Sequence, residues 1–120
     1  MSNPSYSRMH RVNSIVKQVL AEHVEKLKDP RLEFVTITGV ETAHDLRHAV
    51  VFFSALDLSK ADEIRTALDH AATRLRRSLG REVRMKYTPS LVFRLDEGII
   101  EGEKIEALFR RIEGVDDADE

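Results

Sequence analysis

The chain has 120 residues and contains no cysteine and no tryptophan. Without cysteine it can form no disulfide, offer no thiol for catalysis and build no cysteine-ligated zinc or iron–sulfur site. No apolar run approaches the ~20 residues that span a bilayer, and residues 1–7 lack the apolar stretch of a signal peptide. With 42% hydrophobic and 33% charged residues, the sequence predicts one soluble, cytoplasmic, globular domain.

The common motifs of catalytic and nucleotide-binding sites are also missing. The chain has no G-x-S-x-G, no Walker-type loop and no dinucleotide-binding glycine pattern. His44 and His48 are four residues apart, but they flank an expected hairpin turn rather than lie on a helix, so a metal would lack its ligand geometry. We therefore predict no enzyme activity, no metal site and no cofactor.

The first half of the chain predicts a helix followed by two strands. Apolar residues at helical spacing between Val12 and Leu27 indicate a helix that begins near residue 7, and Asp29-Pro30 ends it. The β-branched segments 34–40 and 49–54 predict strands. Because the turn between them is short and polar, an antiparallel hairpin is favoured.

The second half predicts a helix, a strand and a final short helix. Ser59 and Asp62 fit a capping box, and Gly80 is the expected C-terminal cap. Residues 84–95 return to strand character, with Pro89 implying an edge position or a break, and residues 105–112 form an amphipathic pattern. The order α-β-β-α-β-α predicts an α+β fold with helices on one face of a three-stranded sheet.

Charge is segregated along the sequence. The net charge is −2, yet residues 113–120 hold five carboxylates and no base, so residues 1–112 sum to +3. We therefore divide the chain into a flexible N-terminus (1–6), a folded domain (7–112) and a disordered acidic tail (113–120).

A basic segment follows the middle of the second helix. Residues 74–86 carry six of the nineteen basic groups and one acid. On a helical projection, one stripe beside the apolar face holds His70, Arg74, Arg77 and Arg81. Guanidinium groups match phosphate oxygens with a fork of donors. The stripe is therefore typical of a nucleic-acid contact, although an ordinary solvated helix face carries similar charges.

Aromatic residues make up only 6% of the chain. Phe34, Phe52, Phe53 and Phe93 lie in strand patterns that predict core positions, which leaves Tyr87 as the one aromatic beside the basic segment. A base-stacking surface is therefore not indicated. The sequence predicts recognition of nucleic-acid backbone and shape rather than of base edges.

Beyond these patterns, residues 8–110 resemble the ribosome-binding factor A family of bacterial small-subunit assembly factors. The resemblance rests on the order and spacing of Arg11-Val12, Asp29-Pro30-Arg31-Leu32, Val35-Thr36-Ile37-Thr38-Gly39-Val40-Glu41, Asp45-Leu46-Arg47-His48-Ala49, Ala71-Ala72 running into Leu75-Arg76, and Pro89-Ser90-Leu91-Val92-Phe93. It implies a type II KH-like domain in which a helix–kink–helix replaces the G-x-x-G loop, and the sequence contains no G-x-x-G. The kink in the family falls at an alanine followed closely by a glycine. That glycine is missing at Ala71-Ala72-Thr73.

The resemblance also implies a function in ribosome biogenesis. Members bind free 30S small ribosomal subunits, assist late maturation and processing of 16S rRNA, including the region of its 5′-terminal helix, and support growth at low temperature. We expect a monomer whose partners are 16S rRNA and the 30S subunit, with no small-molecule substrate and no membrane.

The predicted RNA-binding residues come from the basic segment and from turns. The first group is Arg74, Arg77, Arg81, Arg84 and Lys86, and the second group, at the first helix and in turns, is Arg8, Arg11, Arg31 and Arg47. Two other classes stay open. One is an adaptor whose basic stripe binds an acidic protein, and the other is a nuclease or RNA-modifying enzyme, which the missing catalytic residues disfavour.

Overall fold

The computed structural model describes residues 4–98 and 102–118, which form three helices, three strands and two short 3₁₀ turns. The elements are α1 (Pro4–Lys26), η1 (Pro30–Leu32), β1 (Val35–Thr42), β2 (His48–Ala55), η2 (Leu58–Lys60), α2 (Ala61–Glu82), β3 (Ser90–Leu95) and α3 (Gly102–Ala118). The predicted order α-β-β-α-β-α is confirmed.

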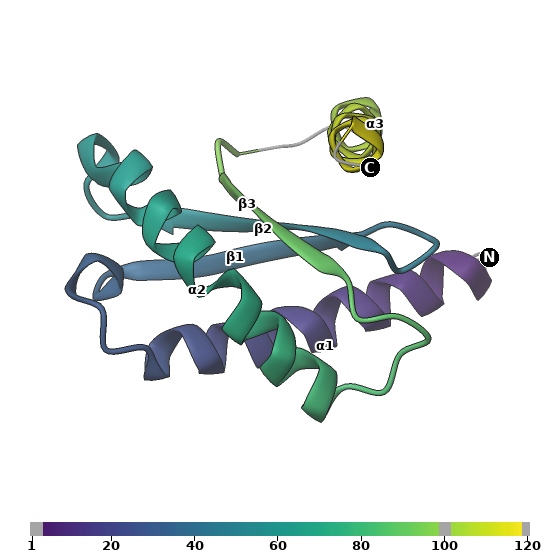
Figure 1. Ribbon diagram of the computed structural model, residues 1–120, viewed down its shortest axis with the longest axis horizontal. Helices are drawn as coiled ribbons and strands as arrows, with labels where there is room; N and C mark the ends of the chain where they lie inside the picture. The colour runs from purple at the N-terminus through teal and green to yellow at the C-terminus, as the bar shows by residue number, and fades with distance from the viewer. Residues whose placement is uncertain (1–3, 99–101, 119–120) are drawn as a thin grey trace.

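The sheet has the order β1-β2-β3 (Figure 1). β1 and β2 form the predicted antiparallel hairpin, with a register shift between Ile37 and Gly39. β2 and β3 are parallel, so the chain must cross over between them, and α2 supplies that crossover. β3 begins at Ser90 rather than at Arg84, because the segment before Pro89 forms a loop.

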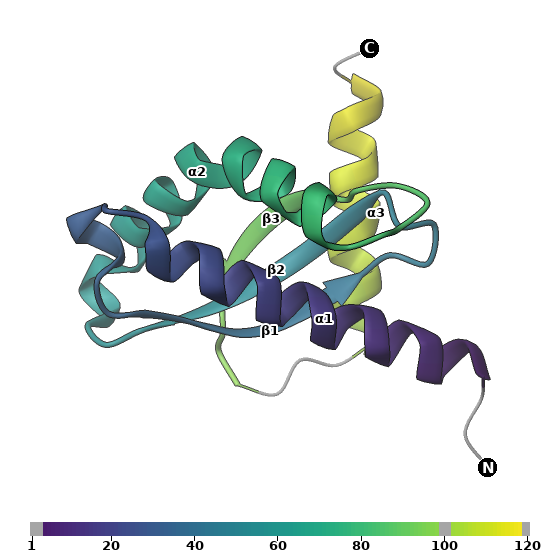
Figure 2. The same ribbon diagram turned by 90° about the horizontal axis from the view of Figure 1, so that it is seen from below.

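Two helices bury the face of the sheet that carries the main core. Figure 2 shows α1 and α2 on the near side of the strands, and Ala49, Val51 and Phe53 of β2 belong to the cluster that also contains Leu68 and Leu75 of α2. All five side chains are at most 1% exposed. The predicted apolar face of α2 is thereby confirmed.

The third helix covers the opposite face. Val50 and Phe52 alternate with the core residues of β2 and are also buried, so they point away from α1 and α2. α3 contacts β2 and lies behind the sheet in Figure 2. The α+β fold with a three-stranded sheet is confirmed, but its helices are divided between both faces rather than gathered on one.

Three details at the ends of elements differ from the sequence expectation. The capping box does not form, because Asp57 rather than Ser59 caps the turn that precedes α2, accepting hydrogen bonds from Ser59. Gly80 is not a cap but lies inside α2, where a Cβ would come within 3.0 Å of the Thr88 hydroxyl. Phe34, predicted in the core, is 66% exposed, because it precedes β1 at the end of the sheet.

The helices also reach beyond the predicted domain boundaries. α1 begins at Pro4, since proline suits the first turn of a helix, and helical backbone continues through residues 113–118 of the predicted tail. Residues 1–3 and 119–120 lie outside the described residues. α2 is a single α-helix across Ala71-Ala72-Thr73, so the implied kink is no break in that helix. Among the described helices, none is long and apolar enough to cross a bilayer.

The facing of α2 gives a direct test of the fold. Leu75 is 1% exposed, so Leu75→Ala should lower the free energy of unfolding by about 2–5 kcal/mol through lost burial and the cavity left behind. Arg77→Ala, two residues on and exposed, should stay within about 0.5 kcal/mol of the parent. Urea unfolding of the three proteins measures both, and equal losses would contradict the facing.

Candidate nucleic-acid interface

Three arginines of the predicted stripe meet the end of α1. Arg74, Arg77 and Arg81 line a hollow of about 300 Å³ together with His23 and Lys26, the basic residues in the last turn of α1. Leu27 and Leu75 complete its apolar part. We call the five basic residues the basic groove. Five donors of positive or potentially positive charge around one hollow suit an anion with several oxygens.

The charge of the basic groove is little offset within the described residues. Glu82 contacts His23, while the three arginines are exposed. His70, the first member of the stripe, does not line this hollow. The hollow therefore gathers three of the four residues of the stripe predicted from sequence.

A second group of basic residues gathers where two loops meet. The Arg47 guanidinium lies over the Tyr87 ring, 4.4 Å from its centroid, and the Lys86 ammonium lies 5.5 Å from the same centroid. Both distances fall within the range of cation–π attraction. We call Arg47, Lys86 and Tyr87 the loop cluster. The ring holds two cations near each other, which favours a phosphate contact.

Hydrogen bonds fix the backbone on which the loop cluster stands. The Arg47 N–H donates to the Asp45 carboxylate at 3.0 Å, and the Arg47 carbonyl accepts from the Ser90 N–H at 2.9 Å. Arg76 donates from Nε and Nη2 to the Thr88 carbonyl at 3.1 and 2.9 Å, next to Tyr87. Arg76 thus ties the loop to α2 through its guanidinium.

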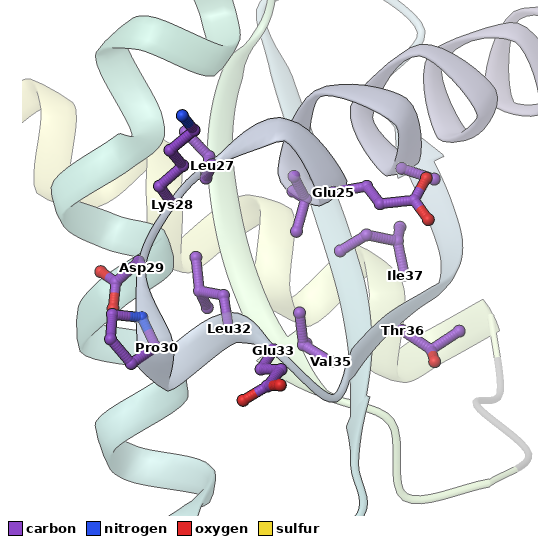
Figure 3. Close-up of a pocket in the computed structure, with 12 residues that line it drawn as sticks. Glu25, Leu27, Lys28, Asp29, Pro30, Leu32, Glu33, Val35, Thr36 and Ile37 are labelled. Atoms are coloured by element: carbon purple, nitrogen blue, oxygen red, sulfur yellow. The ribbon is translucent and has the colours of Figure 1, made fainter.

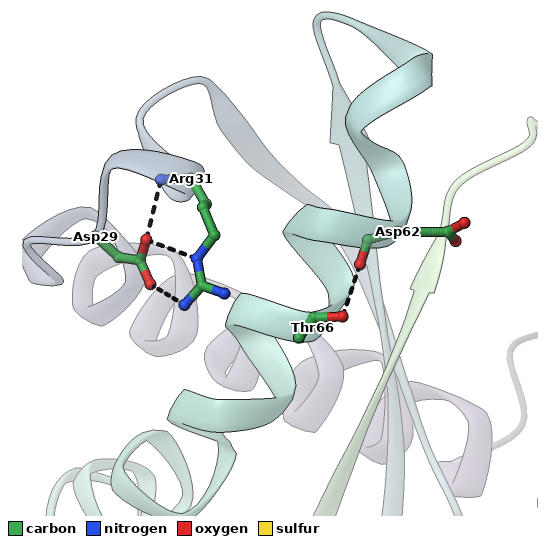
Figure 4. Close-up of polar contacts among 4 residues, drawn as sticks. All are labelled: Asp29, Arg31, Asp62 and Thr66. Atoms are coloured by element: carbon green, nitrogen blue, oxygen red, sulfur yellow. Dashed lines mark hydrogen bonds and ion pairs between the residues drawn. The ribbon is translucent and has the colours of Figure 1, made fainter.

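Arg31 is engaged within the protein. Figure 4 shows its guanidinium against the Asp29 carboxylate, with Nε and Nη2 donating at 3.0 and 2.7 Å. These hydrogen bonds lower the pKa of Asp29, so the pair stays ionised near neutral pH. Of the predicted RNA-binding residues, Arg31 is therefore the least available to a phosphate.

The remaining predicted residues are exposed but are not gathered by the groove. Arg84 lies in the loop after α2. Arg8 and Arg11 lie near the start of α1, and a helix rise places Arg8 about 22 Å along the axis from His23. A site that included them would have to extend along most of α1.

The hollow beside η1 is lined mainly by aliphatic side chains rather than by basic ones. Its volume is about 670 Å³ and its lining includes Leu27, Leu32, Val35 and Ile37, with Glu25 and Glu33 at its sides (Figure 3). Within the described residues there is also no cluster of three histidine or carboxylate side chains fit for a metal.

Sequence reasoning missed some basic residues that the fold brings together. His23 and Lys26 complete the basic groove, yet they lie about 50 residues from Arg74 in the chain. The feature of the sequence that could have pointed to them is the group of basic residues in the last turn of the first helix. Arg94 was also missed. Burial, and after it the charges of Arg65 and Arg111, lower the pKa of Arg94, while the charge of Asp69 opposes them.

Comparison with known proteins decides the family. The family model described as ribosome-binding factor A matches residues 8–109, most of the chain. The chain belongs to the ribosome-binding factor A family. The resemblance inferred from the sequence is confirmed. The ribosome-binding factor A of Heliobacterium modesticaldum is 41% identical over 114 residues, covering 93% of this chain and 94% of its own.

Solved structures of ribosome-binding factor A share the fold. The crystal structure of ribosome-binding factor A from Thermus thermophilus aligns with a TM-score of 0.71 and 30% identity, covering 75% of this chain and 98% of that one. A homology model of the Thermus thermophilus factor, fitted into a cryo-EM map of its complex with the 30S subunit, aligns with a TM-score of 0.57 and 34% identity. It covers 68% of this chain and 88% of that one.

The tie between Arg76 and Thr88 can be tested apart from function. Arg76→Lys keeps the charge but loses the two-pronged hydrogen bond, so it should cost about 1 kcal/mol and lower the melting temperature by ~4–8 °C. Amide hydrogen exchange in residues 84–88 should rise. Arg77→Lys is the matched control and should leave both measurements unchanged. Equal amide hydrogen exchange in the two variants would contradict a stabilising role of the Arg76–Thr88 hydrogen bonds.

Proposed function

We propose that this chain is a non-enzymatic assembly factor that binds free 30S subunits by contacting phosphates of 16S rRNA. In this role it assists late maturation and processing of 16S rRNA near the 5′-terminal helix. It acts as a cytoplasmic monomer, without a cofactor or a small-molecule substrate. The observation that carries the proposal is the basic groove, in which residues from two helices surround one hollow.

The groove suits RNA backbone for reasons of charge and shape. Arg74, Arg77 and Arg81 stand on successive turns of one rigid helix, so their guanidinium groups are held in a row without help from the ligand. Each can donate a forked pair of hydrogen bonds to phosphate oxygens. By neutralising several phosphates at once, the groove reduces the repulsion between neighbouring phosphates and holds the rRNA strand in place.

The loop cluster extends this surface beyond α2. Its Arg47 and Lys86 are positioned by the Tyr87 ring and by fixed backbone, so less side-chain entropy is lost on binding. Because both cations approach the ring, Tyr87 acts here as a support for cations rather than as a base-stacking surface. The support from relatives is that the Thermus thermophilus factor has been placed in a 30S complex.

A quadruple variant tests the proposal. Changing Arg74, Arg77, Arg81 and Arg84 together to Gln should weaken binding both to free 30S subunits and to naked 16S rRNA fragments. Each lost phosphate contact removes about 0.7–0.9 from the slope of log affinity against log salt, so the slope should become shallower by ~2–4. Filter binding over a salt series measures both quantities.

The control is a test that the quadruple variant is still folded. Circular dichroism and thermal melting should show that the quadruple variant keeps its fold, since all four substituted arginines are exposed. Unchanged affinity and slope in a folded variant would reject the assignment to the groove. Weakened binding to an acidic protein, with rRNA binding intact, would instead support the adaptor function.

Arg31 and Arg77 should differ as single substitutions. Arg31 is held by Asp29, so Arg31→Gln should change rRNA affinity by less than about twofold. Arg77→Gln removes an exposed cation of the groove and should weaken binding by about three- to tenfold, the range expected for one charged contact. Equal losses in a direct titration would mean that Arg31 leaves Asp29 to bind RNA.

A further inference from the structure

One end of the sheet exposes large apolar side chains. Phe34 is 66% exposed, Leu56 81% and Leu58 70%, the three highest values among the exposed large hydrophobic residues described. We call Phe34, Leu56 and Leu58 the apolar sheet end. Such a group, at one place on a small domain, marks an interaction site rather than scattered surface.

The strand register places these side chains together. Val35 pairs with Ala55 at the open end of the hairpin. Phe34 and Leu56 are the next residues beyond this pair. Both stand just outside the strands, next to Val35 and Ala55, which pack against the main core, and Leu58 lies two residues farther along the chain, in η2. In Figure 1, α3 is seen end-on and lies on the side of the hairpin turn, away from η1 and η2. Phe34, Leu56 and Leu58 are accordingly exposed.

The charges around the apolar sheet end are mainly negative. Glu33 precedes Phe34, Asp57 separates Leu56 from Leu58, and Glu63 lies in the first turn of α2, all three exposed. Two bases also lie here, Lys60 in η2 and Lys28, which lines the hollow beside η1. Asp62 lies 3.8 Å from Arg65, and Figure 4 shows its carboxylate directed away from the Asp29–Arg31 pair. These carboxylates repel phosphates and attract cationic side chains.

The free edge of β1 adjoins this surface. β1 is an outer strand of the sheet, and the hollow of about 670 Å³ lies along it, lined by Leu27, Leu32 and Val35 with Glu25 and Glu33 beside them (Figure 3). An extended segment that follows this edge could pair with the backbone near Val35. It would meet aliphatic side chains in the hollow on one side and the apolar sheet end on the other.

We propose that this end of the molecule docks an extended, Lys/Arg-rich polypeptide segment that carries apolar side chains. The apolar sheet end and the hollow receive its apolar residues, while Glu33, Asp57 and Glu63 receive its cations. The inference rests on the proposed function in one respect, since it expects the partner segment on the 30S subunit. It assigns to that assembly a protein contact separate from the rRNA contact of the basic groove.

Photochemical crosslinking identifies the occupant. The full chain with benzoylphenylalanine in place of Phe34 is bound to free 30S subunits and irradiated. We expect a crosslink to a protein, mapped by mass spectrometry to a segment rich in Lys and Arg. The same photoreactive residue in place of Ile15, exposed on α1 outside the apolar sheet end, is the matched control. In place of Arg77 it should crosslink to rRNA.

Substitutions separate this contact from the rRNA contact. Phe34→Ser combined with Leu56→Ser and Leu58→Ser should weaken 30S binding by at least about tenfold, the loss typical of a central apolar anchor. Binding to naked 16S rRNA and its salt slope should stay unchanged. Ile15→Ser should alter neither affinity. Glu33→Gln with Glu63→Gln should also weaken 30S binding while leaving rRNA binding equal or tighter.

The outcomes decide between occupants. A crosslink from position 34 to rRNA, to a second copy of this chain or to a segment poor in Lys and Arg would overturn the inference. So would a yield no higher than at position 15, or unchanged 30S affinity in the folded triple variant. If rRNA binding survives the quadruple arginine change while position 34 crosslinks as expected, the proposed function fails at the groove and this inference stands.

Discussion

The fold depends on a central strand that is buried on both sides. β2 sends Ala49, Val51 and Phe53 toward α1 and α2, and Val50 and Phe52 toward α3. A shift of this strand by one residue would move the large Phe52 and Phe53 side chains to the opposite faces, where the packed helices leave no matching space. β2 therefore fixes the register of β1 and β3, and through them the positions of the hairpin turn and of the loop that carries Tyr87.

The sequence predicted what repeats locally and missed what depends on distant neighbours. The apolar spacing of Leu68 and Leu75 fixed one face of α2, so the adjoining stripe of arginines could be placed from helical periodicity alone. The partner of that stripe could not, because His23 and Lys26 meet it only through packing of α1 against α2. Phe34 shows the same limit, since a strand pattern does not reveal where the covering helix stops.

Charge is distributed over the folded molecule as unevenly as along the chain. The basic groove and the loop cluster gather cations on α1, α2 and two loops, whereas Glu33, Asp57 and Glu63 lie at the end of the sheet near η1 and η2. A net charge of −2 conceals this separation. An assembly of RNA and basic protein presents both signs, so a two-signed surface also restricts how the domain is oriented on it.

The parallel pairing of β2 with β3 has a consequence for the order of events during synthesis. The hairpin can form from neighbouring residues, but β3 reaches β2 only after α2 has been made and packed, which is a slow, non-local closure. The Ser90 N–H that holds the Arg47 carbonyl, and the Thr88 carbonyl that holds Arg76, are in place only then. A growing chain can thus bring α1 and α2 together around the basic groove before the loop cluster is fixed in place. An unfinished copy therefore lacks the fixed loop cluster that adjoins α2 in the complete one.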